Sequence, residues 1–207
     1  MLATLLPALR FTLPAGGKLD PRTLFPEPID AVALEVGFGA GEHLAQQALW
    51  APRTGFIGAE VFENGVVKLV GEAKRLGLAN LRLFIDDARL LLEALPEASL
   101  ARAFVLFPDP WPKLRHHKRR FVSTATLDRL ADALGNGAEL RLATDDVDYV
   151  RWMLERLTAH RAFEWLARRP CDWRERPPDW PQTRYEEKAI DAGRRPIFLR
   201  FRRRTRQ

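Results

Sequence analysis

Short apolar segments alternate with helical segments along most of this chain, and this alternation limits the possible folds more than any other feature. Each apolar segment has the length of a strand, and strands that are separated by helices pair in parallel through right-handed crossovers. We therefore expect an α/β fold, a single domain with a doubly wound, mostly parallel sheet. The expected strands are residues 32–36, 56–61, 81–85, 103–107, 139–143 and 196–203, and the expected helices are residues 42–49, 64–76, 89–95, 124–134 and 147–157.

The two ends of the chain do not show this alternation. Residues 1–30 hold five of the 15 prolines and no clear periodicity, so we expect an irregular lead-in to a domain over residues 31–207. Residues 173–181 hold two tryptophans and three prolines, and we expect a surface loop there. The only cysteine, Cys171, cannot form an internal bridge, and neither a signal peptide nor a long apolar run is visible. We therefore expect a cytoplasmic protein with no membrane contact.

The charge of the chain favours a polyanionic partner. The net charge is +6 and the pI is near 10.0, and most of the cations are arginines, whose forked guanidinium suits phosphate. A solvated helix face is the alternative explanation for the densest run, but its position directly after a proline-rich turn favours phosphate contact. No cysteine lies near its two histidines, so we expect no zinc site. That run comprises Lys113, Arg115, His116, His117, Lys118, Arg119 and Arg120, and a second group of arginines at residues 194–206 would extend the positive surface or form a solubilising tail.

A glycine-rich turn follows the first expected strand. Gly37, Gly39 and Gly41 stand where an open α/β sheet binds its ligand, and glycines let the backbone approach a ligand closely. The short spacing and the acidic neighbours Glu35 and Glu42 oppose a dinucleotide pyrophosphate, which needs positive potential. They suit a cationic cofactor such as a sulfonium. The alternative is a tight turn that binds nothing.

Acidic residues also follow the next two expected strands. Glu60 ends the second strand, where a carboxylate accepts hydrogen bonds from ribose hydroxyls in nucleoside-binding sheets. Asp87 follows the third strand and could accept from an adenine amino group, and Asp86 is chemically just as suitable. Acids at three successive strand ends suit S-adenosylmethionine, although acids are also common at helix N-termini because of the helix dipole.

The turn Phe107–Pro112 presents Asp109 between two prolines. Proline fixes its own backbone and restricts the residue before it, so we expect Asp109 to be held in an extended geometry. Its carboxylate could accept from the N1 and exocyclic amino hydrogens of guanine, a pair of donors that adenine lacks. A guanine N7 carries a lone pair and no hydrogen, so its methylation needs positioning and no general base. Alternatively, Asp109 only completes a turn, and Trp111 either stacks on a base or packs that turn.

Together these motifs resemble the bacterial tRNA (guanine-N7-)-methyltransferase family over nearly everything from Glu35 to Arg203. The likeness is strongest in Phe107–Lys113 with the cations that follow, and it extends to the segments 35–39, 58–61, 143–145 and 183–186. The resemblance implies a Rossmann-like methyltransferase fold with a seven-stranded sheet. It also implies transfer of a methyl group from S-adenosylmethionine to N7 of a guanine in the variable loop of tRNA.

The resemblance also implies a role for each matching residue. The cofactor would be bound by Glu35, Glu60 and Asp87, which favours Asp87 over Asp86, and Asp109 would be catalytic and also face the cofactor. The substrate would be contacted by Lys113, Asp145, Thr183, Arg184, Tyr185 and Glu186, and the RNA by Arg115, His116, His117, Lys118, Arg119 and Arg120. The expected partners are therefore tRNA and S-adenosylmethionine, with no metal, in a monomer or a homodimer. One departure is that residues 1–30 carry only three cations, whereas family members often begin with an arginine-rich arm.

Other functions fit parts of the sequence. A methyltransferase that acts on a protein or a small molecule would share the cofactor residues, and it would turn over without RNA. A noncatalytic RNA-binding module would use the basic run and leave the glycine turn without a ligand. A nicotinamide dehydrogenase is the weakest alternative, because Glu42 and the short glycine spacing both oppose a pyrophosphate.

Overall fold

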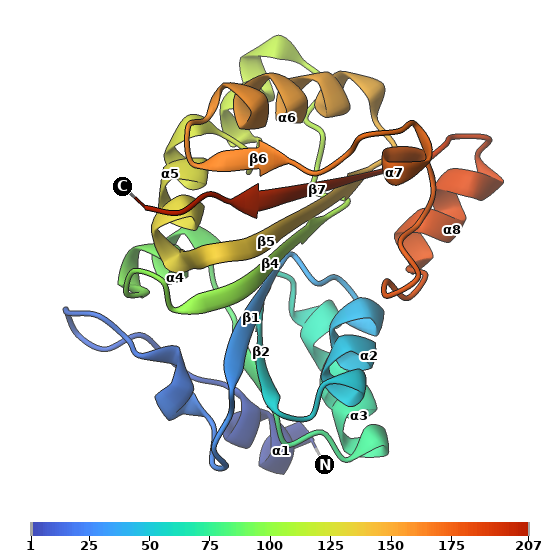
Figure 1. Cartoon of the computed structure of the whole chain (residues 1–207). Coiled ribbons are helices and arrows are strands. Elements are labelled where there is room, and N and C mark those ends of the chain that lie inside the picture. The colour runs from blue at the N-terminus through green and yellow to red at the C-terminus, as the bar shows by residue number, and fades with distance from the viewer. Residues whose placement is uncertain (1, 207) are drawn as a thin grey trace.

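The protein is built on one seven-stranded sheet (Figure 1). The computed structural model describes the backbone of residues 2–206 and the side chains of residues 5–206. The strand order is β3-β2-β1-β4-β5-β7-β6, in which β7 runs antiparallel to β5 and β6 and the other neighbours are parallel. The expected doubly wound, mostly parallel sheet is thus confirmed. The strands are β1 (Ala31–Val36), β2 (Thr54–Ala59), β3 (Leu81–Phe84), β4 (Leu100–Leu106), β5 (Leu134–Thr144), β6 (Phe163–Trp165) and β7 (Ile197–Arg203).

Helices cover both faces of the sheet (Figure 1). One apolar core joins residues such as Leu34 and Ile57 of the sheet to α4, α5 and α6. The other joins Ala33 and Phe104 to α2 and α3, because successive strand residues point to opposite faces. The helices are α1 (Leu2–Leu9), α2 (Glu42–Trp50), α3 (Glu63–Leu76), α4 (Ala88–Ala94), α5 (Thr124–Ala133), α6 (Val147–Ala159), α7 (Cys171–Arg174) and α8 (Arg184–Asp191), with 3-10 turns η1 (Pro21–Leu24) and η2 (Leu114–Arg119).

The short elements β6, α7 and α8 were not predicted, and two further segments contradict the sequence-based expectations. Residues 2–9, expected to be irregular, form α1, whose Leu9 is buried in the core beside α3. The segment 173–181 is not only a surface loop, because Trp180 is 2% exposed and packs on Phe198 with ring centroids 5.5 Å apart. Both errors have one cause, since neither segment shows a period that would reveal which side chains face the core.

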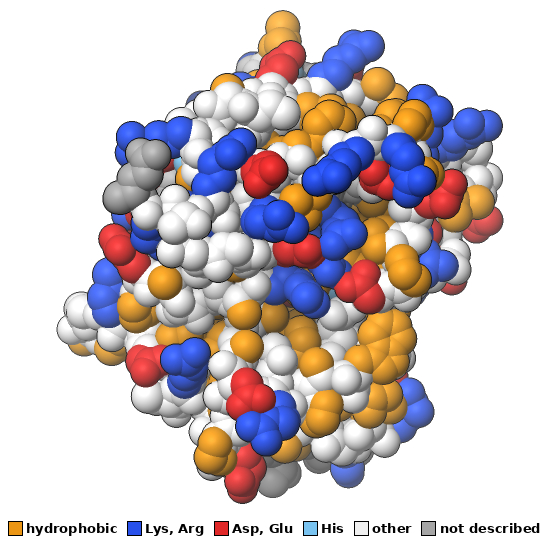
Figure 2. All heavy atoms as spheres, viewed as in Figure 1, with side chains coloured by type: hydrophobic (Ala, Val, Ile, Leu, Met, Phe, Trp, Pro, Cys, Tyr) orange, Lys and Arg blue, Asp and Glu red, His pale blue; other side chains and the backbone are white. Residues whose placement is uncertain are grey.

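The arginines at the C-terminus are ordered against α5 and do not form a solubilising tail. Arg203 donates from Nε to the carbonyl oxygen of Ala131 at 2.8 Å, and Arg206 donates to that of Leu134 at 2.8 Å. These carbonyls lie at the end of α5, where positive charge is favourable. Figure 2 shows further Lys and Arg side chains over the part of this face built by β5, β6 and β7, with Asp and Glu between them.

The strand order changes direction between β1 and β4, which pair in parallel at the centre of the sheet. Open α/β sheets bind their ligands at the carboxyl ends of such a pair. The glycine turn leaves β1 at this edge, and the segment with Asp109 leaves β4 beside it. The fold therefore brings the two strongest sequence motifs together.

Candidate active site

The glycine turn after β1 is held against α3 by close backbone contact. Gly37, Gly39 and Gly41 have φ angles of 68°, 57° and 84°, in the left-handed region that other residues disfavour. A Cβ on Gly65, in the first turn of α3, would lie 2.0 Å from the carbonyl oxygen of Gly39. Only glycine fits at position 65 without moving this turn.

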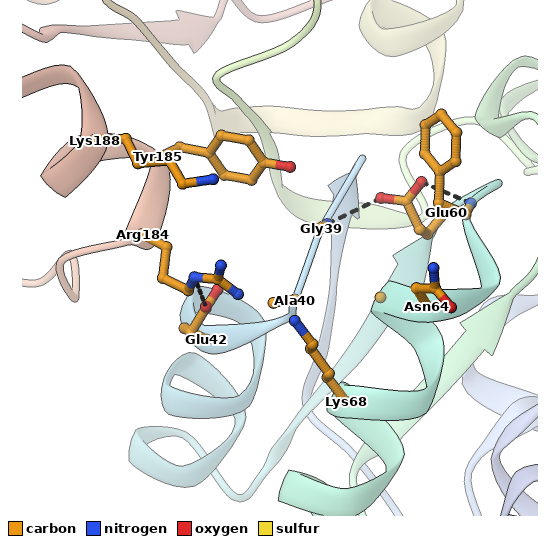
Figure 3. Close-up of a pocket in the computed structure, with 11 residues that line it drawn as sticks. Gly39, Ala40, Glu42, Glu60, Asn64, Lys68, Arg184, Tyr185 and Lys188 are labelled. Carbon is orange, nitrogen blue, oxygen red and sulfur yellow. Dashed lines mark hydrogen bonds and ion pairs between the residues drawn. The ribbon is translucent and has the colours of Figure 1, made fainter. Parts of the chain in front are cut away.

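Glu60, directly after β2, fixes the other side of the glycine turn. Its carboxylate accepts hydrogen bonds from the N–H of Gly39 at 2.9 Å (Figure 3) and from those of Val61 and Phe62 at 2.8 and 3.1 Å. The residue is 6% exposed. These three bonds give the carboxylate one orientation at the edge of the sheet, which is the preorganisation that a ligand-binding group needs.

The acids after β3 are also engaged with their own backbone. Asp87 caps α4 by accepting from the N–H of Arg89 at 2.9 Å, and it forms an ion pair with the Arg89 guanidinium at 3.0 Å. Asp86 accepts from the N–H of Asp87 at 2.7 Å. Helix capping, the alternative explanation for these acids, therefore does occur, and it leaves both side chains at the same edge as Glu60.

The Asp109 turn (residues 107–112) has a strained backbone on both sides of the carboxylate. Phe107 and Trp111 have φ angles of 48° and 44°, although each precedes a proline and carries a bulky side chain. Such strain persists only where the surrounding structure imposes it, and it is concentrated at functional sites. Asp109 itself is exposed.

Arg120 supports this turn from below and does not face solvent. It is 2% exposed, its Nε donates to the carbonyl oxygen of Pro110 at 2.7 Å, and its guanidinium lies 5.0 Å from the ring centroid of Tyr149 and 4.8 Å from that of Trp152. Burial raises the pKa of Tyr149 to about 12, so this ring stays uncharged. The basic run therefore turns inward at its last residue, and the RNA contact predicted for Arg120 stays a prediction.

The rest of the basic run forms η2 on the surface. Arg119 lies with its guanidinium 4.8 Å from the ring centroid of Trp111, and His117 packs edge-on against Trp152 at 5.2 Å. Stacking with Arg119 shows that Trp111 helps to pack this loop. The exposed cations are Lys113, Arg115, Lys118 and Arg119, whereas His116 and His117 are half-buried.

The segment 176–188, which includes the first part of α8, faces the same edge of the sheet. Thr183 caps α8 by accepting from the N–H of Glu186, and Glu186 is buried and accepts from Nε of Arg176 at 3.1 Å. Burial raises the pKa of Glu186, against the opposing effect of Arg176. Between these two residues, Tyr185 stacks on Phe107 with ring centroids 6.4 Å apart and is 50% exposed.

Two neighbouring cavities meet at Glu60, Phe62 and Tyr185. The Asp109 cavity has a volume of about 330 Å³, and its lining includes Gly37, Glu60, Asp86, Asp87, Arg89, Phe107, Asp109, Trp111, Arg119 and Tyr185. The lysine cavity has a volume of about 320 Å³, and its lining includes Gly39, Glu42, Glu60, Asn64, Lys68, Arg184, Tyr185 and Lys188 (Figure 3). Volumes of this size are typical of small-molecule sites.

Comparison with known proteins decides the family. A family model described as "Putative methyltransferase" matches residues 30–199. A tRNA (guanine-N(7)-)-methyltransferase from Rhodospirillum rubrum is 54% identical over 100% of this chain and 82% of that protein. One from Mesorhizobium japonicum is 50% identical over 95% of this chain and 84% of that protein.

The chain belongs to the tRNA (guanine-N7-)-methyltransferase family. It is therefore a methyltransferase. Solved structures agree on the fold: an rRNA methylase from Streptococcus thermophilus superposes with a TM-score of 0.59 at 16% identity, covering 86% of this chain and 89% of that chain. A putative methyltransferase from Streptococcus mutans, solved in complex with SAH, gives a TM-score of 0.54 at 12% identity, covering 85% and 90%.

Not every residue predicted for the methyltransferase site reaches a cavity. Glu35 is 2% exposed, and its carboxylate pairs with Nδ1 of the buried His43 at 2.6 Å. Asp145 pairs with Arg194 at the end of β5, and Gly41 packs on Leu69 of α3. The residues that line neither cavity are Glu35, Gly41, Lys113, Asp145, Thr183 and Glu186, along with the basic run apart from Arg119.

Sequence reasoning missed several residues that line the two cavities. Lys188 stands four residues after Arg184, so both lie on one face of α8, and Lys68 stands one turn after Asn64 at the start of α3. These spacings are the signal that could have found the lysines. Within residues 2–206, no helix is long and apolar enough to cross a membrane, and no group of three or more His, Cys, Asp or Glu could hold a metal ion.

Proposed function

We propose that this methyltransferase transfers a methyl group from S-adenosylmethionine to N7 of a guanine in the variable loop of tRNA. The observation that carries the proposal is the Asp109 cavity. It joins carboxylates from the ends of β2, β3 and β4 to a rim of exposed cations at η2. The relatives are named for the same reaction. A cytoplasmic location, with the tRNA, is part of the proposal.

The residues present fit S-adenosylmethionine. Glu60 and Asp87 offer carboxylate oxygens at two strand ends in a cavity of about 330 Å³, and Gly37 brings bare backbone to the same place. We assign ribose binding to Glu60, adenine binding to Asp87 and contact with the donor side of the site to Asp109. When bound, the cofactor supplies an electrophilic methyl group on a positively charged sulfur. The acidic lining suits that charge.

The protein's part in the reaction is to select and orient the base. Asp109, exposed on a strained turn, accepts hydrogen bonds from N1 and the exocyclic amine of guanine and so leaves N7 free to react. The N7 lone pair forms the bond to the methyl carbon as the methyl–sulfur bond of the donor breaks, so the positive charge passes from the sulfur to the purine ring and no proton has to leave the base. The positive charge that develops on the ring is stabilised by the Asp109 carboxylate. Tyr185, which lines the same cavity beside Phe107 and is 50% exposed, offers a stacking surface for the base.

The exposed cations of η2 contact RNA phosphates in this proposal. Lys113, Arg115 and Lys118 carry charge without filling the cavity, as expected of residues that position the RNA backbone. Half-buried His116 and His117 are assigned to the same contact at the base of the loop. Binding should then weaken steeply as salt concentration rises.

Mapping the methylated base tests the proposal. Purified protein is incubated with methyl-labelled S-adenosylmethionine and tRNA, the RNA is cleaved at 7-methylguanosine, and the labelled fragment is sequenced. Label at N7 of one variable-loop guanine is expected, and a tRNA with adenosine at that position should stay unlabelled. Label on a pyrimidine or on an exocyclic amine, or turnover without RNA, would contradict the proposal. A protein that binds tRNA but gives no heat with S-adenosylmethionine would be a noncatalytic binding module.

A further inference from the structure

The lysine cavity carries positive charge that the proposed reaction does not use. Lys68 reaches from α3 toward the glycine turn, and Arg184 and Lys188 reach from α8 across the same space (Figure 3). These cations come from elements far apart in the sequence, and the fold points them into one cavity of about 320 Å³. Such convergence is not expected of charges that only solubilise a surface.

Within the described residues, the acids that line this cavity have backbone or arginine partners, and none pairs with its lysines. Glu60 accepts from three backbone N–H groups, and Glu42 lies 4.0 Å from Arg184. Glu72, one turn beyond Lys68 on α3, binds Arg75 through two hydrogen bonds. Among the described residues, Lys68 and Lys188 form no ion pair, and Lys188 only approaches the ring of Tyr185, at 6.0 Å. Two lysine charges therefore remain for an anionic ligand.

The position of the cavity indicates which anion it takes. Tyr185 and Phe62 separate it from the Asp109 cavity, so the two sites are neighbours with a shared wall. A nucleotide whose base reaches the exposed Asp109 carboxylate carries phosphates on both sides of its sugar. Arg119 of η2 lines the Asp109 cavity, and the lysine cavity adjoins it at Phe62 and Tyr185, which line both.

We propose that Lys68 and Lys188 bind a backbone phosphate that flanks the methylated guanine. The proposal rests on the proposed function, because it needs an RNA base in the Asp109 cavity. The exposed cations of the basic run and the two lysines then bind the phosphates on the two sides of one unstacked nucleotide. Phosphate contacts of this kind fix the register of an RNA without reading its sequence.

A charge-removing double variant tests this site. In Lys68→Gln with Lys188→Gln, the KM for tRNA should rise about tenfold, kcat should stay within about twofold, and the slope of log affinity against log salt should become less negative by about 0.7. The control, Lys74→Gln with Arg129→Gln, removes two exposed charges outside the cavity and should leave all three unchanged. Calorimetry with S-adenosylmethionine should give one Kd for wild type and both variants.

Neutral RNA linkages identify the phosphate. Two RNAs are made, each with a single methylphosphonate linkage, on the 5′ side of the target guanine in one and on the 3′ side in the other. For the wild-type protein, the linkage that replaces the phosphate bound by the lysines should raise the KM about tenfold. For the double variant, the same linkage should leave the KM unchanged. A double variant with wild-type KM for tRNA would overturn the proposal, and so would one that loses affinity for S-adenosylmethionine, because the cavity would then hold the cofactor carboxylate. If wild type methylates no guanine N7, the proposed function fails instead, so the two failures are distinguishable.

Discussion

The Asp109 turn and the segment 176–188 both contribute to the lining of the Asp109 cavity, and they are made rigid in different ways. The Asp109 turn takes most of its stiffness from its own backbone, since three prolines alternate with Asp109 and Trp111. The segment 176–188 is held instead by side chains that reach away from it. Trp180 fills the core, and the Asp179 carboxylate binds Arg141 at 2.7 Å.

The difference teaches which parts of an active site depend on the whole fold. The prolines narrow the conformations open to the Asp109 turn, and contacts such as the hydrogen bond from Arg120 hold its strained backbone in place. A segment held by docking keeps its shape only while its partners, here Arg141 on β5 and Phe198 on β7, stay in place. Mutations in the first segment should therefore affect turnover, whereas mutations in the second should affect stability as well.

The largest effect is expected for Trp180→Ala. Deleting this buried side chain should lower the free energy of unfolding by about 3 to 5 kcal/mol, which corresponds to roughly 6 to 20 °C in melting temperature for a chain of this length. Denaturant unfolding measures the loss. The indole Nε1 has no hydrogen-bond partner among the described residues, so Trp180→Phe should cost less than about 1.5 kcal/mol. An equal loss in both variants would show that the segment is not held by packing.

Asp109→Ala should have the opposite profile. We expect kcat for tRNA to fall by about a thousandfold, or about 4 kcal/mol, because the base loses both its orienting acceptor and its charge stabilisation. Because Asp109 is exposed, the unfolding free energy should change by less than about 0.5 kcal/mol, and the Kd for S-adenosylmethionine should stay within an order of magnitude. Steady-state kinetics, denaturant unfolding and calorimetry on one preparation give the three numbers. Near-normal turnover would remove Asp109 from the mechanism.

The variant Arg120→Met tests whether the prolines are sufficient to hold the Asp109 turn. The variant keeps the bulk of the side chain and loses the hydrogen bond to the Pro110 carbonyl and the stacking of charge on Tyr149 and Trp152. If the turn needs this support, kcat should fall about tenfold, or about 1.4 kcal/mol, at unchanged affinity for S-adenosylmethionine. Arg115→Met, on an exposed cation of the same basic run, serves as the control and should raise the KM for tRNA instead. Wild-type kcat in Arg120→Met would mean that backbone stiffness alone is enough.

The same distinction explains what could be predicted from the sequence. The sheet apart from β6, and the helices α2 to α6, follow from periodicity. Glu60, Asp87 and Asp109 reach the cavity because each lies within three residues of the end of a strand. The burial of Arg120 and Trp180 depends on partners 30 or more residues away or on another element, which no local pattern reveals. Glu35 shows the limit within a strand: its face was predictable, but its partner His43 was not. β6 was missed because three residues show no period.

The smallest effect expected is a pH dependence of the free energy of unfolding that arises from Asp179 in the segment 176–188. Burial pushes the pKa of Asp179 up, but the hydrogen bond and charge of Arg141 outweigh it, and the net pKa lies below the ordinary value. A depressed carboxyl pKa adds stability that is present above the unfolded pKa of about 3.9 and is lost as pH falls through the folded value. Asp179→Asn should therefore cost at most about 1 kcal/mol at pH 7, since this side chain is 51% exposed, and nothing near pH 2. Urea unfolding from pH 7 to 2 measures the difference, and Asp191→Asn, an exposed acid on α8 without an ion pair among the described residues, should show none. A cost for Asp179→Asn that persists at pH 2 would mean that the carboxylate charge is not what docks the segment.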